Sequence, residues 1–117
     1  MIELFQLHKK FGNFHAVRDL TLRVFPEEVF GFLGPNGAGK TTTIRIMVGL
    51  MKPTSGRVLL LGKDIARQPV EAKSILGYIP DRPYLYEKLT GQEILEFVAD
   101  LHSLDSGEAR RKRVAEL

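Results

Sequence analysis

The sequence contains no cysteine, and it has no long apolar segment. Without cysteine, the 117-residue chain forms no disulfide and offers no thiolate to a metal, which fits a reducing cytosol. No apolar run approaches the roughly 18 residues that a membrane-spanning helix needs. The first residues, from Met1 to Leu4, lack the basic start and the apolar core of a secretory signal. We therefore expect one modest globular domain.

The charge balance gives little indication of a partner. The net charge of +3 is too small to indicate nucleic acid by itself, and we expect no nucleic-acid partner. The one dense basic run is Arg110, Arg111, Lys112 and Arg113. Such a run is typical of a solvated helix face, and contact with anionic lipid or nucleic acid is the alternative.

What the sequence does contain is a phosphate-binding loop at residues 34–41, which fits G-x-x-x-x-G-K-[ST]. Several backbone N–H groups must meet the phosphate oxygens at once, and glycines allow the tight curl that this requires. The lysine places an ammonium on the β- and γ-phosphates, and the threonine hydroxyl is placed for Mg²⁺. The residues are Gly34, Pro35, Asn36, Gly37, Ala38, Gly39, Lys40 and Thr41.

The residues around the loop support this interpretation. Residues 29–33 are apolar and predict a buried strand that leads into the loop. A helix is predicted from Thr42 onward, and its N-terminus would face the anion. Its expected apolar face is Ile44, Met47, Val48 and Met51. A chance glycine-rich turn is the alternative, and a Rossmann dinucleotide site is disfavoured because Thr42 stands where that motif needs glycine or alanine.

The rest of the chain predicts antiparallel strands and short helices around this loop. Strands are expected at 2–7, 20–25 and 57–61, with a hairpin whose turn at 62–64 leads back into 65–66, and a second core strand at 76–79. Proline near its first turn marks a short helix at 69–74. A capping box at Thr90 and Glu93 opens a helix whose expected apolar face is Ile94, Phe97, Val98 and Leu101. A last helix follows residues 105–108.

Beyond the loop, the chain resembles the N-terminal portion of an ABC transporter ATP-binding subunit over essentially its whole length. The likeness is strongest in residues 31–43, in Gly49-Leu50 with 53–56, and in Gly62-x-Asp64-Ile65. Residues 43–47 are most similar to drug, sodium or polysaccharide exporters. The resemblance implies an α/β fold with a P-loop NTPase core of the ABC ATPase type, an N-terminal antiparallel β subdomain and the start of a helical subdomain.

The resemblance also implies a role for each site residue. Phe11 would stack on adenine with Val17 beside it, although Phe11 also suits a core position. Residues 36–42, including Thr42, would wrap the phosphates of ATP. Lys40 would be catalytic by neutralising the β- and γ-phosphates, and Thr41 would bind Mg²⁺. Catalysis would then consist of positioning and electrostatic stabilisation of an in-line attack by water.

One position departs from the family pattern. Asp81 stands where the family has a glutamine that reaches the metal and the attacking water. A carboxylate attracts Mg²⁺, so we expect Asp81 to be a second catalytic residue, which binds the metal directly or through water. The alternative is that Asp81 caps its turn or pairs with Arg82 or Lys88.

The resemblance implies a single partial nucleotide-binding domain over 1–117. The sequence lacks the Leu-Ser-Gly-Gly-Gln signature, the strand that ends in Asp-Glu, and a switch histidine, since its three histidines lie elsewhere. We therefore expect ATP hydrolysis only from a full-length parent, and weak nucleotide binding from this segment alone. The expected divisions are an antiparallel β part at 1–28 and 57–68, a P-loop core at 29–56 and 69–81, and the start of a helical subdomain at 82–117.

The implied partners are a second nucleotide-binding domain and a transmembrane permease subunit, which residues 82–90 would contact. The implied location is the cytoplasmic face of the membrane. Alternatives are a non-transport ABC-type ATPase that acts on chromosomes or ribosomes, and an inactive nucleotide-binding fragment. A regulatory GTPase is disfavoured because neither Asn-Lys-x-Asp nor Asp-x-x-Gly occurs.

Overall fold

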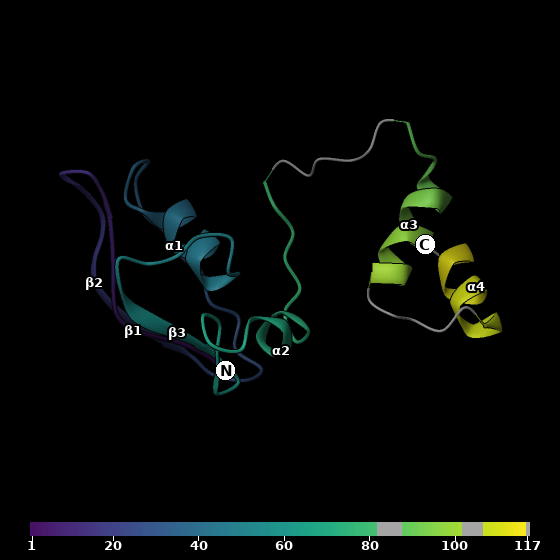
Figure 1. The fold of residues 1–117 in the computed structure, drawn as a ribbon, viewed down its shortest axis with the longest axis horizontal. Helices are drawn as coiled ribbons and strands as arrows, with labels where there is room; N and C mark the ends of the chain where they lie inside the picture. Colours follow the sequence, from purple (N-terminus) through teal and green to yellow (C-terminus); the bar gives the residue numbers. More distant parts are fainter. Residues whose placement is uncertain (82–87, 102–106, 117) are drawn as a thin grey trace. The chain divides into compact units, whose positions relative to one another are not determined.

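The computed structural model describes residues 1–81, 88–101 and 107–116. The chain forms two compact units, Met1–Tyr78 and Ile79–Leu117, and each is described by itself. The first unit contains a sheet with two helices, and the second contains two helices (Figure 1).

The first unit is built on a four-stranded antiparallel sheet in the order β2-β1-β3-β4. The predicted hairpin forms, but its turn consists of Leu61 and Gly62 rather than 62–64, and its returning strand is 63–64 rather than 65–66. Both turn residues have positive φ, +47° and +80°, as a two-residue type I′ turn requires. The three predicted strands are confirmed with shifted bounds, as β1 (Ile2–Phe11), β2 (Phe14–Val24) and β3 (Ser55–Leu60), and the returning strand of the hairpin is β4 (Lys63–Asp64).

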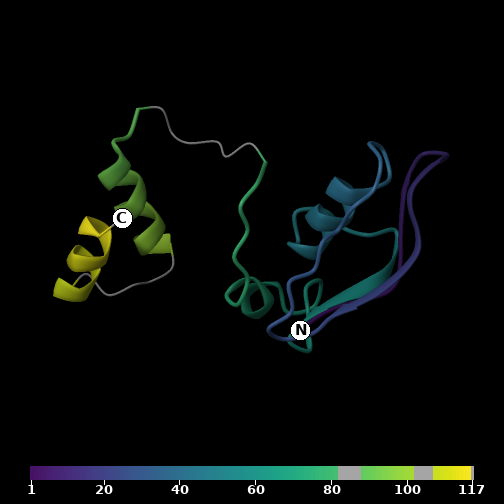
Figure 2. The same ribbon diagram turned by 180° about the vertical axis from the view of Figure 1, so that it is seen from behind.

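The core of this unit lies between the sheet and α1 (Lys40–Met47), which covers one face of the sheet (Figure 2). Leu4, Leu7 and Val58 from the strands are buried against Ile46 of the helix. The short α2 (Pro69–Lys73), predicted from its proline, adds Ala72 to the same cluster. The apolar face of the sheet thus fixes the helix that begins at the glycine-rich loop.

The predicted apolar face of α1 is confirmed only in part. Val48 is buried and Met47 and Met51 pack against the core, but Ile44 is exposed, and Thr43 and Ile46 are buried instead. Apolar residues stand at four of the five positions 44–48, so the sequence is compatible with more than one orientation of the helix. The helix also ends earlier than predicted, because Gly49 at φ +69° forms a Schellman motif in which the N–H groups of Gly49 and Leu50 bond the carbonyls of Ile46 and Arg45.

The predictions of core strands at 29–33 and 76–79 were wrong for this structure. Neither segment is a strand, and Val29 is 100% exposed while Leu33 and Ile79 are each 91% exposed. A strand forms only where its N–H and C=O groups find a neighbour, and within the described residues nothing pairs with 29–33. The apolar side chains of these two segments are therefore largely exposed to solvent in this structure.

We expect the 117-residue chain to self-associate in solution through residues 29–33. Unpaired backbone beside exposed Val29 and Leu33 is a template for pairing with another chain. Sedimentation should show association that grows with concentration, and the double variant Val29→Lys/Leu33→Lys should reduce it. The control is Val70→Lys on α2, an equally apolar exposed position that should change nothing. A sharp, concentration-independent melt of a monomer would contradict this expectation.

The second unit is a pair of helices, α3 (Gly91–Leu101) and α4 (Glu108–Ala115). The predicted capping box is confirmed: the Thr90 N–H donates to Glu93 Oε2 at 2.7 Å, and the Glu93 N–H donates to Thr90 Oγ1 at 3.3 Å. The bond from the Thr90 backbone holds the pKa of Glu93 below its ordinary value. The helix N-terminus is therefore capped from both sides.

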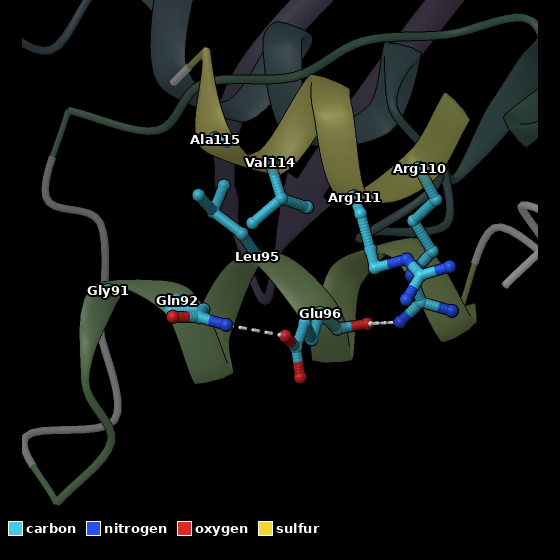
Figure 3. A pocket seen from close by; sticks show the side chains of 8 residues that line it. All are labelled: Gly91, Gln92, Leu95, Glu96, Arg110, Arg111, Val114 and Ala115. Carbon is cyan, nitrogen blue, oxygen red and sulfur yellow. Dashed lines mark hydrogen bonds between the residues drawn. The ribbon is translucent and has the colours of Figure 1, made fainter. Parts of the chain in front are cut away.

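The faces of these helices correct two predictions. The buried residue of α3 is Ala99, whereas Phe97, Val98 and Leu101 are exposed. Arg110, predicted on a solvated face, instead turns toward α3, with its side chain only 13% exposed. It donates to Asp100 Oδ1 at 2.8 Å. It also donates to the Glu96 carbonyl at 2.7 Å, the bond drawn in Figure 3. The arginine ties the two helices together, which the sequence pattern did not indicate.

Candidate functional site

The glycine-rich loop leads directly into α1. A turn closes it, in which the Ala38 N–H donates to the Pro35 carbonyl at 3.2 Å. Gly37 and Gly39 both have φ near +80°, a region that other residues rarely adopt. Gly39 is also the N-cap of α1, and its carbonyl accepts the first helical bond from the Thr43 N–H at 2.8 Å. The glycines therefore turn the chain from the loop into the helix.

Gly39 also lets the loop lie directly on β2. A Cβ atom at this position would overlap the carbonyl oxygen of Ala16 and come within 3.3 Å of Val17 Cγ2. At Gly37, by contrast, an added Cβ would meet nothing within 4 Å. The two glycines share a backbone conformation, but only at Gly39 does the packing against β2 exclude any side chain.

The N-terminus of α1 is a centre of positive potential. The first N–H groups of a helix have no partner within it, and here no side chain caps them and no acidic residue stands in the first turn. The Lys40 side chain folds back over the loop, where its Nζ donates to the carbonyls of Gly34 at 2.5 Å and Pro35 at 2.7 Å. An ammonium and unpaired amides therefore lie together at this end of the helix.

Beside the loop lies a hollow of about 260 Å³. Its lining contains one cationic side chain, Lys40, and no carboxylate. One end is polar and belongs to the loop and α1, while the other is apolar and belongs to the β1–β2 hairpin. This arrangement suits a ligand that joins an anionic group to an apolar one. The lining residues are Phe11, Phe14, Ala16, Asn36, Gly37, Gly39, Lys40, Thr41 and Thr42.

The hollow brings together most of the predicted site residues. Phe11 of the hairpin stands beside the loop residues, which lie far from it in sequence. The carbonyls of Gly34 and Pro35 accept hydrogen bonds from Lys40, but these two residues do not line the hollow. Ala38 lines a neighbouring hollow instead. The members predicted from sequence that line the main hollow are Phe11, Asn36, Gly37, Gly39, Lys40, Thr41 and Thr42.

Two predicted residues lie elsewhere. Val17 is buried in the core beneath Gly39, and its side chain does not line the main hollow. In a strand with bulges, its facing could not be read from sequence alternation alone. Asp81 is exposed and belongs to the second unit. Its role at the metal therefore stays a prediction.

Phe11 is held in place at the tip of the hairpin. The turn beyond it places Gly12 at φ +56°. Lys9 Nζ lies 5.1 Å from the centroid of the Phe11 ring and donates to the Lys52 carbonyl at 2.8 Å. The ammonium thus anchors one side of the ring to the segment after α1.

Sequence reasoning missed Phe14 and Ala16, both of which line the hollow. Phe14 pairs with Phe11 across the hairpin. The signal was available, since two phenylalanines flank the short Gly12-Asn13 turn. The role of Ala16 is the close approach of its carbonyl to Gly39, which no sequence pattern indicates.

His15 does not add to the positive charge at neutral pH. Burial lowers its pKa below the ordinary value, and the neighbouring Lys10 and Arg18 lower it further. Its Nδ1 atom is buried, and within the described residues it has no hydrogen-bond partner. Lys40 therefore remains the cation that faces the hollow.

A larger hollow, of about 680 Å³, lies between α3 and α4 (Figure 3). Leu95 and Val114 point toward one another across it, and Gln92 bonds Glu96 at its edge at 2.9 Å. It has no glycine-rich loop, and although the start of α3 at Gly91 and the arginines at 110 and 111 line it, the Glu96 carboxylate lines it as well. The smaller hollow beside Lys40 is therefore the candidate site for a phosphorylated ligand.

Comparison with known proteins identifies the family. Residues 17–117 match the family model of the ABC transporter. The probable multidrug ABC transporter ATP-binding protein YbhF of Escherichia coli (strain K12) is 40% identical over 117 residues, which cover 100% of this chain and 20% of YbhF. The uncharacterised ABC transporter ATP-binding protein YhcH of Bacillus subtilis (strain 168) is 45% identical over 96 residues, 82% of this chain and 32% of YhcH.

Solved structures agree with this identification. An ATP-binding subunit of an ABC transporter superposes with a TM-score of 0.84 at 34% identity, over 95% of this chain and 46% of that one. The dimeric ATP-binding cassette MJ0796 bound to ADP and Pi superposes with a TM-score of 0.82 at 29% identity, over 99% of this chain and 55% of that one. The chain belongs to the ABC transporter family, and its fold is that of the ABC ATPase cassettes.

The chain spans about a fifth of YbhF and about half of the two solved chains. Among the described residues, no helix is both long enough and apolar enough to cross a membrane.

Proposed function

We propose that this chain is the nucleotide-binding part of an ABC transporter ATP-binding subunit, which binds ATP and, as a full-length protein, hydrolyses it to drive transport across a membrane. The observation that carries the proposal is the hollow in which Lys40, the N-terminus of α1 and Phe11 lie together without a carboxylate. A triphosphate would bind at the positively charged end of the hollow, formed by the loop and α1, and a nucleotide base would bind at its apolar end, formed by the hairpin. ATP has both groups on one molecule.

The loop and α1 would hold the phosphates. The Lys40 ammonium would exchange the carbonyls of Gly34 and Pro35 for the β- and γ-phosphate oxygens, where the bonds join opposite full charges and are stronger. The unpaired amides of the first helical turn would donate to the same group. These residues bind and orient the triphosphate for attack by water, which is the main contribution of proteins to phosphoryl transfer.

The donor set fits Mg²⁺. The described residues contain no group of three or more histidine, cysteine, aspartate or glutamate side chains that could hold a metal by themselves. An exposed hydroxyl such as that of Thr41, at the edge of the hollow, suits an ion bound mainly by phosphate oxygens and water. When bound, Mg²⁺ neutralises charge that develops on the transferred phosphate. Thr41 and Asp81 are the residues that we propose for it.

The proposed partners are a second nucleotide-binding domain and a transmembrane permease. Dimerisation is supported by the solved cassette MJ0796, which is dimeric. The permease contact is proposed for residues 82–90, of which 82–87 lie outside the described residues. The proposed location is the cytoplasmic face of the membrane, on the basis of family membership.

The proposal is tested by titrating the full-length protein with fluorescent ATP, with and without Mg²⁺. We expect saturable binding that Mg²⁺ strengthens, and a variant Asp81→Asn that binds about tenfold more weakly only when Mg²⁺ is present, because a metal ligand has lost its charge. The control is Asp19→Asn, an exposed aspartate whose carboxylate lies 3.8 Å from His8 Nε2. Equal affinity of the Asp81 variant would remove the metal assignment, and a lack of saturable binding would refute the proposed function.

A further inference from the structure

The tip of the β1–β2 hairpin presents two large aromatic side chains to one hollow. Phe11 is 48% exposed and Phe14 is 61% exposed, and neither belongs to the core cluster. They are partners in the strand register, so their side chains lie on the same face of the hairpin. Both line the hollow beside the glycine-rich loop. The packing of the first unit therefore does not account for Phe14.

The two rings differ in how they are held. Lys9 contacts the Phe11 ring and is itself anchored to the Lys52 carbonyl. Within the described residues, the only aromatic pair in ring contact is Phe30 with Phe32, so Phe11 and Phe14 do not stack on each other. Two neighbouring rings that face one hollow without closing on each other leave room for a third planar group.

The hollow is divided by chemistry. Its polar side chains, Asn36, Lys40, Thr41 and Thr42, all come from the loop and α1. Its hairpin end has only the apolar side chains of Phe11, Phe14 and Ala16. An apolar end of this kind contacts the face of a ring, and it offers no side-chain donor or acceptor to the edge of a base.

We infer that the Phe14 ring is a second contact for the nucleotide base, beside Phe11. The two rings together make the site prefer nucleotides whose base has a larger ring area. This inference rests on the proposed nucleotide binding and adds to it a residue and a specificity. Purine triphosphates bind in preference to pyrimidine triphosphates, because a purine covers more of the two phenyl rings. ATP and GTP bind with similar affinity, because they differ at edges that the hairpin end does not contact.

The test measures binding of ATP, GTP, CTP and inorganic tripolyphosphate to the full-length protein and its variants. Phe14→Ala should weaken ATP and GTP about tenfold, as loss of one aromatic stacking partner does, and should leave tripolyphosphate binding unchanged. Phe14→Tyr keeps the ring and should retain affinity. Phe25→Ala, which removes an equally exposed ring that does not line the hollow, is the matched control and should have no effect.

The outcomes separate this inference from the function on which it rests. If Phe14→Ala binds ATP normally while Phe11→Ala is impaired, Phe14 is not a base contact and the inference is wrong. It is also wrong if ATP and tripolyphosphate affinities fall together, because Phe14 then acts on the fold of the loop. If the unmodified protein binds neither ATP nor tripolyphosphate, the proposed function itself fails. Loss of ATP affinity with tripolyphosphate binding intact supports the inference.

Discussion

Replacement of Gly39 by alanine should remove nucleotide binding and destabilise the protein by about 2 to 5 kcal/mol. The backbone of Gly39 has φ +82°, which costs an alanine about 1 to 2 kcal/mol. The added methyl group would also overlap the Ala16 carbonyl oxygen, so the loop would have to move away from β2. That movement would displace the N-terminus of α1, which we propose binds the phosphates.

The matched control is Gly37→Ala. Gly37 has almost the same φ, +83°, but an added Cβ would meet nothing within 4 Å. Its cost should therefore be limited to the conformational term of about 1 to 2 kcal/mol. Denaturant unfolding and ATP titration of the two full-length variants make the comparison. Equal losses of stability would contradict the assignment of close packing between Gly39 and β2.

Local chemistry made much of this structure predictable. The motif at 34–41 placed the loop correctly before a helix, because glycine, lysine and threonine at that spacing have few other uses. The capping box at Thr90 and the type of element formed at β1, β2, β3 and α2 were also predictable. Each depends on residues that lie within a few positions of one another in the sequence.

Features that depend on distant partners were not predictable. Residues 29–33 have the composition of a buried strand, but a strand also needs a neighbour, and among the described residues none pairs with them. The inward position of Val17 follows from bulges in the β1–β2 pairing. The inward turn of Arg110 depends on Asp100 and Glu96 of another helix. Only the packed structure brings these groups together.

The largest effect on binding should come from Lys40→Ala, which we expect to weaken ATP affinity at least about 100-fold. Lys40 is the one cationic side chain in the lining of the hollow, and its ammonium donates to the Gly34 and Pro35 carbonyls, which phosphate oxygens would replace as its acceptors. Loss of two charge-assisted hydrogen bonds costs about 3 kcal/mol or more, which corresponds to about two orders of magnitude in affinity. Folding should be little affected, because the side chain is not part of the core.

The control for this variant is Lys112→Ala, which removes the same charge from an exposed position on α4, in the other unit. Far-ultraviolet circular dichroism of both variants should match that of the unmodified protein. A change in net charge alone would lower the ATP affinity of both variants equally. A lower affinity of Lys40→Ala than of Lys112→Ala therefore indicates that the position of Lys40 in the loop is responsible.

Equilibrium titration of the full-length protein and its Lys40→Ala variant with ATP and Mg²⁺, side by side, tests most directly whether the glycine-rich loop holds the triphosphate. We expect saturation of the unmodified protein and of Lys112→Ala at the same concentration, and no saturation of Lys40→Ala at a concentration about 100-fold higher. Equal affinity of Lys40→Ala for ATP would contradict the assignment of this loop as the nucleotide site.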